Sequence, residues 1–443
     1  MDFSQFYTLQ PSERLNLLQS AIIEAHTFHF AHNPAYRWTV SGRGIGGQLA
    51  PEQFERVLRP AGITFKGYAD WVGMFPEETP RAFVEWLREQ ISCELPLDRL
   101  DAWPARFATL EALLVSLERT YQDLGLEIVT SSGTSGRMSF VPRDREGLEL
   151  AMRAFFTAIQ ATWGVQRGTG MLFMMPAETR VAMARVARMG TRVLGWDQDG
   201  PVHFAIPFPA TPDRIRIRSG RSFKGSLTGW SERHIQNPFM AWADDHLAVP
   251  RILANTRAAL QSMQSSNRPI FLLGSLSHLH QFALQANHGE AVALPPGSRV
   301  ASGGGMKVGY DKTQAEIRED LKTLFAGTAV SDVYGMAEAN WAAFECPYGN
   351  YHIPPWVYAV VTDSSDRILR ASQAEGLLAF FDPLGGGGLY PPFFQTSDWV
   401  QLCGSPVFDP ALACPCGEQT AYIHGAIQRV DLVEEAGCAG VLA

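Results

Sequence analysis

Short apolar runs alternate with amphipathic segments from residue 269 onward, and this alternation limits the folds open to the chain. The strand-like runs are 269–273, 299–301, 330–334, 356–361, 377–381, 399–402 and 421–423. Residues 312–325 place Ile317, Leu321 and Leu324 on one face of an expected helix. Because strands that alternate with helices form a sheet covered by helices, the sequence predicts the α/β fold class.

The part of the sequence before residue 269 is richer in helical patterns. Helices are expected near 52–58, 80–92, 105–124 and 146–163, and strands are expected at 126–129 and 171–175. The first of these strands leads directly into a Ser/Gly-rich loop.

Composition excludes several classes of protein. With 46% hydrophobic residues in 443, the chain has ample material for a core. A net charge of −8 argues against a nucleic-acid partner bound on a basic face. No apolar run reaches the ~20 residues of a membrane span, and residues 1–4 lack the pattern of a signal peptide. The six cysteines are few and unevenly spaced, so a cytoplasmic location is expected.

The loop Thr130–Arg137 reads T-S-S-G-T-S-G-R and carries the clearest chemical pattern. Glycines let several backbone N–H groups point at one anion, and hydroxyls add donors without bulk, so the loop suits a phosphate. It lacks the lysine and spacing of a Walker loop. A surface turn is the alternative for such a loop taken alone. The candidate phosphate-binding residues are Ser131, Ser132, Gly133, Thr134, Ser135 and Gly136.

This loop resembles the phosphate-binding signature of the adenylate-forming superfamily, which includes acyl-CoA synthetases. Three further segments occur in the order that the superfamily has: Ser302–Lys307, Tyr334–Glu338 and Thr396–Asp398. The second and third depart from the family pattern, with Ala337 for a hydroxyl residue and Ser397 for glycine. The resemblance implies ATP as substrate and Mg²⁺ as cofactor.

The resemblance also assigns roles to single residues. Glu338 would hold Mg²⁺, and Asp398 would accept hydrogen bonds from the ribose hydroxyls. The segment 271–278 resembles the one that lines the acyl pocket. The residues expected around the adenine ring are Tyr334, Gly335, Met336, Gly303, Gly304 and Gly305. In isolation, a strand-end aromatic, a solvated glutamate and a capping aspartate would explain the same residues.

The resemblance implies a large N-terminal domain with helix-covered sheets and a mobile C-terminal domain reduced to a short tail. Residues 1–125 would form its mainly helical part, 126–425 the nucleotide- and acyl-binding core, and 426–443 a hinge-like segment and tail. Gln428-Arg429-Val430-Asp431 resembles the hinge, and no lysine follows it. Lys307 is the one lysine within a nucleotide motif and is therefore a candidate for the catalytic cation.

Two branches of the superfamily are most similar, the phenylacetate–CoA ligases and the acyl-protein synthetases of bacterial luciferase operons. The second branch carries its acyl thioester on a Gly-Cys near the C-terminus, which Gly437-Cys438 resembles. We therefore expect activation of a fatty or aromatic acid, transfer to the Cys438 thiol, and an acyl-accepting or reductase protein as partner. The alternatives are an incidental cysteine in an acyl-CoA, aryl-CoA or amine ligase, and an inactive nucleotide-binding protein.

A second cysteine pattern predicts a structural zinc site. Cys346 and His352 are separated by five residues, and Cys414-Pro415-Cys416-Gly417 lies further on. Three thiols and one imidazole make a tetrahedral ligand set for Zn²⁺. Some phenylacetate–CoA ligase relatives have cysteines and a histidine at matching places. Two buried thiols and a turn are the alternative.

Two further clusters receive structural interpretations. Arg214, Arg216, Arg218 and Arg221 lie in a polar stretch, where alternation with isoleucine indicates a solvated loop or an edge hairpin. A docking patch for an acidic partner is the alternative. The pattern H-x-x-H-x-x-H of His26, His29 and His32 contains no carboxylate or thiol between its histidines, and these residues are expected to be core or surface residues.

Overall fold

The structure is a computed structural model that describes residues 2–131, 137–286, 291–303, 310–385, 388–405 and 409–430. Its residues group into two compact units. The first comprises the described parts of Met1–Val129, Ser139–Thr162 and Gly335–Leu432, and the second those of Thr130–Met138 and Trp163–Tyr334. Since each unit combines separate chain segments, the division expected at residues 125 and 425 stays a prediction.

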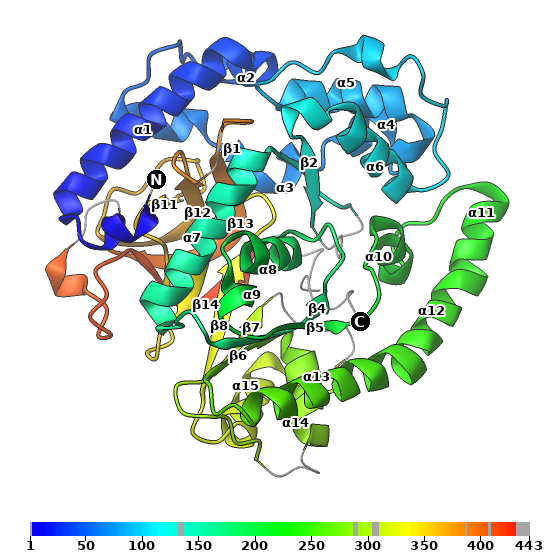
Figure 1. Ribbon diagram of the computed structural model, residues 1–443. Coiled ribbons are helices and arrows are strands. Elements are labelled where there is room, and N and C mark those ends of the chain that lie inside the picture. The colour runs from blue at the N-terminus through cyan, green and yellow to red at the C-terminus, as the bar shows by residue number, and fades with distance from the viewer. Residues whose placement is uncertain are drawn as a thin grey trace. The chain divides into compact units, whose positions relative to one another are not determined.

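The second unit is built on a parallel sheet with the strand order β8-β7-β6-β4-β5 (Figure 1). Its strands are β4 (Gly170–Pro176), β5 (Val202–Ile206), β6 (Ile270–Gly274), β7 (Arg299–Gly303) and β8 (Ala329–Gly335). Every residue of β4 and β6 is buried, as expected of parallel strands with both faces covered.

The second unit contains eight described α-helices. They are α8 (Ala182–Val193), α9 (Trp196–Asp199), α10 (Pro212–Ser219), α11 (Ser226–Ser231), α12 (Asn237–Ala243), α13 (Val249–Gln264), α14 (Leu276–Ala286) and α15 (Gln314–Leu324). Of these, α13, α14 and α15 supply the core against the sheet. Leu272 of β6 shares one hydrophobic cluster with Leu260 of α13 and Ile317 of α15. The helix expected at 312–325 and the helix-covered sheet are thus confirmed.

The first unit contains an antiparallel sheet with the order β11-β12-β13-β14-β10-β9. Its strands are β9 (Ala342–Glu345), β10 (Tyr351–His352), β11 (Tyr358–Thr362), β12 (Gln373–Phe381), β13 (Phe393–Cys403) and β14 (Tyr422–Arg429). The short β1 (Arg59–Pro60) pairs with β13, while β2 (Glu127–Thr130) and β3 (Phe140–Arg143) form a separate pair. The apolar runs at 356–361, 377–381, 399–402 and 421–423 all fall on these strands to within two residues.

The N-terminal helices cover the sheet of the first unit. The unit holds α1 (Pro11–His32), α2 (Pro34–Gly42), α3 (Ala61–Thr64), α4 (Tyr68–Val72), α5 (Pro80–Gln90), α6 (Leu110–Thr120) and α7 (Arg145–Trp163). Short 3₁₀ turns occur at Phe3–Tyr7, Pro51–Val57, Pro76–Glu78, Leu97–Leu100, Gln122–Leu124 and Pro410–Leu412. Ile22 and Tyr36 pack against Phe381 and Phe393. Among the described residues, no helix combines the length and apolar character of a bilayer span.

The three N-terminal histidines are structural, as expected. His26 contacts the Tyr36 hydroxyl and the Gly46 carbonyl oxygen, both at 2.8 Å. The His29 Nδ1 lies 2.7 Å from the Ser92 hydroxyl, and His32 contacts the Phe28 carbonyl of its own helix. Burial lowers the pKa of His29 to about 3, so this side chain is a neutral part of the core.

The arginine cluster does not form the expected loop or hairpin. Residues 212–219 are helix α10, in which the Thr211 side chain accepts a hydrogen bond from the Arg214 N–H and Gly220 ends the helix at a φ of 68°. Arg216 is buried and donates to both carboxylate oxygens of Glu232, at 2.7 and 2.9 Å. The interpretation as a solvated loop or basic strand is therefore wrong for Arg214, Arg216 and Arg218, because distant acidic partners bind these arginines. Arg221 lies exposed in the irregular segment after the helix.

Loss of the Glu232 charge should destabilise the second unit. Glu232→Gln keeps the side-chain shape but leaves the buried Arg216 guanidinium without its counter-charge, which typically costs about 3–5 kcal/mol. Glu149→Gln is the matched control, because Glu149 forms an exposed i,i+4 pair with Arg153 worth at most ~0.5 kcal/mol. Urea unfolding measures both changes in the free energy of unfolding. Equal effects for the two variants would contradict the importance of the buried pair.

Candidate active site and metal centre

The strand order of the second unit creates a switch point between β4 and β6. From β4 the chain continues to β5 on one side, whereas β6, β7 and β8 follow on the other. In open parallel sheets, ligands bind beyond the carboxyl ends of the strands at such a point. The segment 271–278, expected to line an acyl pocket, contains most of β6 and the residues just beyond it. There the Ser275 hydroxyl accepts a hydrogen bond from the His278 N–H at 3.2 Å.

Two of the expected nucleotide segments lie side by side at this same edge. Gly303 is the last residue of β7 and pairs with Val333 of β8, so Tyr334 follows directly beside it. The Ser/Gly loop also starts near the carboxyl end of a strand. Thr130 pairs with Val181 in the segment after β4, and the Thr130 N–H donates to the Arg180 carbonyl at 2.7 Å.

The remaining residues of these motifs are not all described. Ser131 is half-buried, and Gly335 and Met336 continue the chain after Tyr334 toward Glu338. The expected residues Ser132, Gly133, Thr134, Ser135, Gly136, Gly304, Gly305, Lys307 and Cys438 lie outside the described residues.

Glu338 of the first unit is buried and fixed by hydrogen bonds. Its carboxylate accepts a 2.6 Å hydrogen bond from the hydroxyl of Ser139, which is fully buried. Arg143 of β3 donates to the carbonyl oxygens of Ala337 and Ala339, at 2.8 and 3.3 Å, and so fixes the backbone on both sides of Glu338. Burial lowers the pKa of Arg143 to about 10, and Glu338 and Asp382 act in the opposite direction.

Asp382 is a second buried carboxyl group near Arg143. It is 1% exposed, and its Oδ1 accepts a hydrogen bond from the Gly385 N–H at 3.0 Å. Burial raises the pKa of Asp382 to about 7, although Gly385 and Arg143 act to lower it. Within the described residues, Asp382 Oδ2 and Arg143 Nη1 have no hydrogen-bond partner. Buried polar atoms of this kind usually bind an ordered water or a ligand.

Sequence reasoning did not identify Ser139, Arg143 or Asp382. Each is a single polar residue without a spacing pattern, and its role depends on a partner far along the chain. The one available indication was position, because Ser139 and Arg143 follow the Ser/Gly loop by a few residues.

Asp398 and Arg429 face each other on neighbouring antiparallel strands. They are paired residues of β13 and β14, and the Arg429 Nε lies 3.3 Å from the Asp398 Oδ1. Asp398 is buried, while the Arg429 side chain is 48% exposed. The Asp398 N–H donates to the Thr396 hydroxyl at 3.1 Å, which fixes the backbone of the T-S-D motif.

An irregularity in β14 precedes this pair. Trp399 pairs with Gln428, but Gln401 pairs with His424, so two residues along β13 correspond to four along β14. Gly425 lies in the additional segment with a φ of 73°, a conformation that favours glycine. The bulge therefore sets which residue of β14 stands opposite Asp398.

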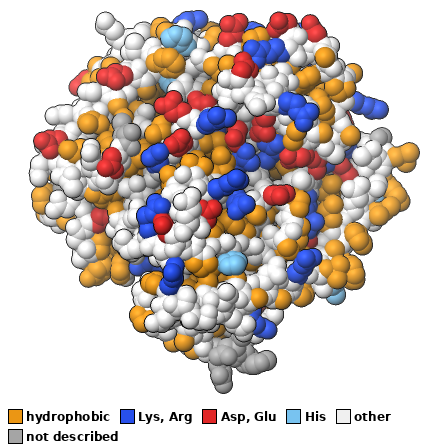
Figure 2. Space-filling model, viewed as in Figure 1, with side chains coloured by type: hydrophobic (Ala, Val, Ile, Leu, Met, Phe, Trp, Pro, Cys, Tyr) orange, Lys and Arg blue, Asp and Glu red, His pale blue; other side chains and the backbone are white. Residues whose placement is uncertain are grey.

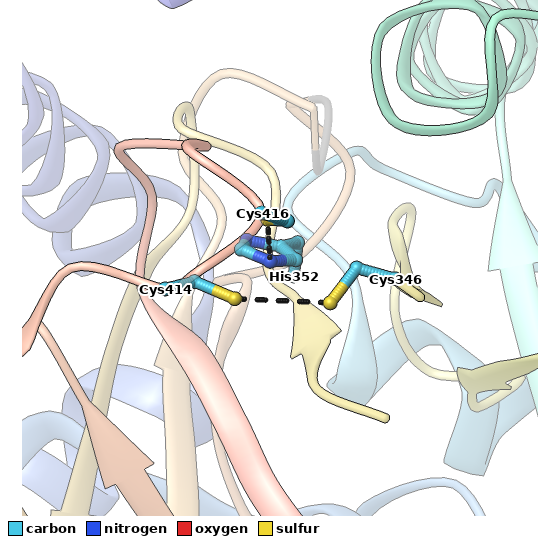
Figure 3. Close-up of side chains that lie close together, drawn as sticks. All are labelled: Cys346, His352, Cys414 and Cys416. Atoms are coloured by element: carbon cyan, nitrogen blue, oxygen red, sulfur yellow. Dashed lines mark hydrogen bonds between the residues drawn. The ribbon is translucent and has the colours of Figure 1, made fainter. Parts of the chain in front are cut away.

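The four expected metal ligands converge at one place in the first unit. Cys346 follows β9, His352 ends β10, and Cys414 and Cys416 belong to a turn before β14 (Figure 3). The Cys346 and Cys414 sulfurs are 3.7 Å apart, and Cys416 Sγ is 3.2 Å from His352 Nε2. All four ligand atoms lie within 4.8 Å of one another.

This geometry fits a tetrahedral zinc ion. Zn–S bonds of about 2.3 Å at tetrahedral angles place two ligand sulfurs ~3.8 Å apart, close to the Cys346–Cys414 separation. That separation is also far too long for the ~2.05 Å bond of a disulfide. The donor set is three thiols and one imidazole, which zinc prefers.

Neighbouring groups orient the ligands. His352 Nδ1 lies 2.8 Å from the Thr420 hydroxyl and 3.7 Å from a carboxylate oxygen of Glu418. We assign the proton to Nδ1, which leaves the Nε2 lone pair toward Cys416, as metal-binding histidines require. The Asn350 amide donates to the Cys414 sulfur at 3.2 Å. Burial raises the pKa of Cys346 and lowers that of His352 to about 4.

No family model matches the sequence. Among curated proteins, the long-chain-fatty-acid–luciferin-component ligase of Aliivibrio fischeri is 29% identical over 106 residues, which are 22% of this chain and 27% of that protein. The match thus spans about a quarter of that relative's length.

Solved structures match over almost the whole chain. An open conformation of 2-hydroxyisobutyryl-CoA ligase with 2-HIB-AMP and CoA has a TM-score of 0.56 at 14% identity, covering 96% of this chain and 77% of that one. The same ligase in its thioesterification state gives a TM-score of 0.55 at 14% identity, covering 96% and 70%. The chain therefore has the fold of this ligase. The expected resemblance to adenylate-forming enzymes is thus confirmed at the level of the fold.

Removal of one metal ligand should release zinc and destabilise the first unit. Purified protein should contain close to one zinc per chain by elemental analysis, and Cys414→Ser should lose most of it. Because the site joins segments far apart in sequence, the variant should also melt at a lower temperature, and a chelator should destabilise the wild type more than the variant.

Cys403→Ser is the matched control for this experiment. Cys403 is buried in the same cluster as Cys346 and Cys414 but does not belong to the convergent set. It should keep the zinc. Equal metal content in wild type and Cys414→Ser would overturn the assignment.

Proposed function

We propose that the protein activates a carboxylic acid with ATP by forming an acyl-adenylate. The observation that carries the proposal is the common edge of the parallel sheet, where Gly303 and Tyr334 lie side by side and the Ser/Gly loop begins near β4. The fold supports it, because the ligase with the same fold is described in complex with an acyl-AMP. The sequence motifs supply the third support.

In the proposed first half-reaction, a carboxylate oxygen of the acid attacks the α-phosphorus of ATP. A new P–O bond forms, the bond from the α-phosphorus to the bridging oxygen breaks, and pyrophosphate leaves. Negative charge accumulates on the phosphate oxygens in the transition state. The N–H and hydroxyl groups of Ser131–Gly136 would stabilise that charge, as fixed dipoles do without reorganising.

Other residues would bind and orient the nucleotide. Glu338 would hold Mg²⁺, which neutralises phosphate charge when bound. The rigid setting of Glu338 between Ser139 and Arg143 supports this role. Asp398 would accept hydrogen bonds from the ribose hydroxyls, with Arg429 beside it. We propose Lys307 as the cation near the reacting phosphate, on the sequence motif alone.

In the proposed second half-reaction, the Cys438 thiolate attacks the acyl carbon. A C–S bond forms, the C–O bond to AMP breaks, and the acyl group stays on the protein as a thioester. The thiol proton passes to solvent. Support comes from Gly437-Cys438 and from the similarity to the A. fischeri ligase. A protein that accepts or reduces the acyl group would complete the reaction in the cytoplasm.

Transfer to coenzyme A is the alternative that a specific observation favours. The ligase of similar fold is described in complex with CoA, in open and thioesterification states. A ligase to an amine would share the first half-reaction. An inactive nucleotide-binding protein is the third candidate, because Ala337 and Ser397 depart from the family motifs. The name of the A. fischeri relative favours a long-chain fatty acid as substrate over an aromatic acid.

Loss of the Glu338 charge should abolish most adenylate formation. Glu338→Gln keeps the size and the hydrogen bond from Ser139 but weakens metal binding. Acid-dependent pyrophosphate release should fall by roughly 100-fold, as for the loss of one strong electrostatic contact in an active site. Glu149→Gln, an exposed change, is the control. A wild-type rate in Glu338→Gln contradicts the assignment, and no acid-dependent release in the wild type favours the inactive protein.

Loss of the Cys438 thiol should separate the two half-reactions. With ATP, Mg²⁺ and a radiolabelled fatty acid, the wild type should become labelled, and neutral hydroxylamine should release the label as it does from thioesters. Cys438→Ser should abolish labelling and keep most pyrophosphate release, because adenylate formation does not use the thiol.

Cys93→Ser is the matched control, since Cys93 is another free cysteine outside the metal cluster. It should label normally. Added CoA supplies the contradicting outcome. If Cys438→Ser then forms as much acyl-CoA as the wild type forms product, Cys438 is incidental and the protein is a CoA ligase.

A further inference from the structure

The helices α11, α12 and α13 follow one another as one long helical segment (Figure 1). The part of it before α13 has an apolar outer face. Six large hydrophobic side chains along it are exposed, from 49% for Trp242 to 84% for Leu227. We call them the apolar stripe; its members are Leu227, Trp230, Ile235, Phe239, Trp242 and Leu247. Figure 2 shows hydrophobic side chains gathered on the right-hand edge, where α11 and α12 lie.

In the part of this segment before α13, the buried face carries ionic contacts, the reverse of the usual pattern. Glu232 and Asp244 are 4% and 1% exposed, and both pair with arginines of α10. Asp244 binds both Arg214 and Arg218. A helix normally turns its charged face to solvent and its apolar face to the core. Here the charges are used for internal contacts, and the apolar side chains face outward.

Two π turns keep the apolar stripe on one face. The Asn237 N–H donates to the Glu232 carbonyl, and the Val249 N–H donates to the Asp244 carbonyl, each five residues back. On an uninterrupted α-helix, at about 100° per residue, Trp230 and Phe239 would point in opposite directions. The additional residue in a π turn reduces the angle between the directions of these two side chains, measured around the helix axis, to roughly 80–90°. The second turn brings Leu247 toward Trp242 in the same way.

Aromatic side chains on the apolar stripe are already ordered by contacts with one another. The Phe239 and Trp242 rings stack with centroids 6.2 Å apart, and His246 stacks on Trp242 at 5.2 Å. Ordered aromatic side chains lose little further entropy when a partner covers them. Trp is also among the residues that contribute most to binding energy at interfaces.

We propose that the apolar stripe is the interface with a second copy of this chain, packed antiparallel about a two-fold axis near Phe239. Aromatic side chains bury ~150–250 Å² each, so covering the stripe removes several hundred Å² per copy, approaching the ~800 Å² per partner of a standard interface. The spacing is self-complementary. In an antiparallel pair, Trp230 would face Leu247 of the second copy, and Ile235 would face its Trp242.

Charge supports a second copy over a lipid surface. Interfacial membrane helices carry Lys and Arg beside their apolar face, which bind anionic lipids. The positions beside this stripe include His234, Pro238 and His246, and the exposed charged residues Arg233 and Asp245 have opposite signs. Glu232 and Asp244 are bound to arginines of α10. Because the flank carries charges of both signs rather than a row of Lys and Arg, it presents no net repulsion to an identical surface.

Sedimentation of the full-length chain tests the proposal. The wild type should show a concentration-dependent monomer–dimer equilibrium. Phe239→Ser should weaken association at least 100-fold, because a two-fold interface loses the side chain twice. Leu284→Ser is the control, since Leu284 is an exposed apolar residue of α14 outside the stripe and should leave the dimer intact. A wild type that stays monomeric, or a dimer insensitive to Phe239→Ser, overturns the proposal.

A mixing experiment tests the antiparallel pairing. Ile235→Lys and Trp242→Glu should each dissociate the dimer, since each places two charges in the apolar interface. Mixed together, they should form a heterodimer with one Lys–Glu pair and one native Ile–Trp contact. Failure to reassociate would contradict the pairing. Vesicles of neutral phosphatidylcholine provide the other arm: a monomer that binds them, and loses binding in Phe239→Ser, would make the stripe a lipid-binding surface.

Discussion

The backbone pairing of strand β14 is the constraint on which both candidate sites of the first unit depend. At its start, β14 pairs with β10 through Tyr422 and His352. This pairing brings the turn before β14, which contains two of the expected metal ligands, close to the other two. At its end, β14 pairs with β13 and places Arg429 opposite Asp398. Antiparallel hydrogen bonds fix this register residue by residue. Metal binding would therefore hold the same strand that contributes to the nucleotide site.

The first-unit part of the proposed active site contains four buried polar residues close together. Ser139, Glu338, Arg143 and Asp382 all lie below the surface, and their contacts connect β3 to the turn after β8 and to the end of β12. Burying such groups is costly unless hydrogen bonds replace the lost water. Most of these atoms have partners, which makes the arrangement rigid. A rigid carboxylate suits an active site, because its position need not be created during the reaction.

Much of the fold could be predicted from the sequence, because apolar runs and amphipathic periods reflect burial directly. The strands β6, β7, β8, β11, β12, β13 and β14 and the helices α7 and α15 follow from such local patterns, whereas the short β9 and β10 were not expected. The convergence of Cys346, His352, Cys414 and Cys416 could be predicted because cysteine and histidine are rare and their spacing is informative. Helix α10 was missed because alternating Arg and Ile imitates the two-residue period of a strand. Its acidic partners, Glu232 and Asp244, lie in a different segment, which no local pattern reveals.

The nucleotide site could be predicted only in part, for a related reason. Gly303 and Tyr334 lie side by side in the second unit, and Glu338 and Asp398 are buried in the first. That these residues share one nucleotide site stays a prediction from the motifs. Ser139 and Arg143, which hold Glu338, belong to no motif, since any polar residue at the right point in space could serve. The Ser/Gly loop beyond Ser131 stays a prediction from sequence.

The bulge in β14 limits how the length of this part of the chain can change. Between His424 and Gln428, the strand contains two residues more than the matching stretch of β13. Deleting both additional residues would give a regular pairing in which Arg429 still stands opposite Asp398. Deleting one would leave a shift of a single residue, which turns the side chains on one side of it to the opposite face of the sheet. We therefore expect the fold to tolerate insertions and deletions between the cysteine turn and Arg429 when they add or remove an even number of residues. This constraint on length is not visible in the identity of any single residue.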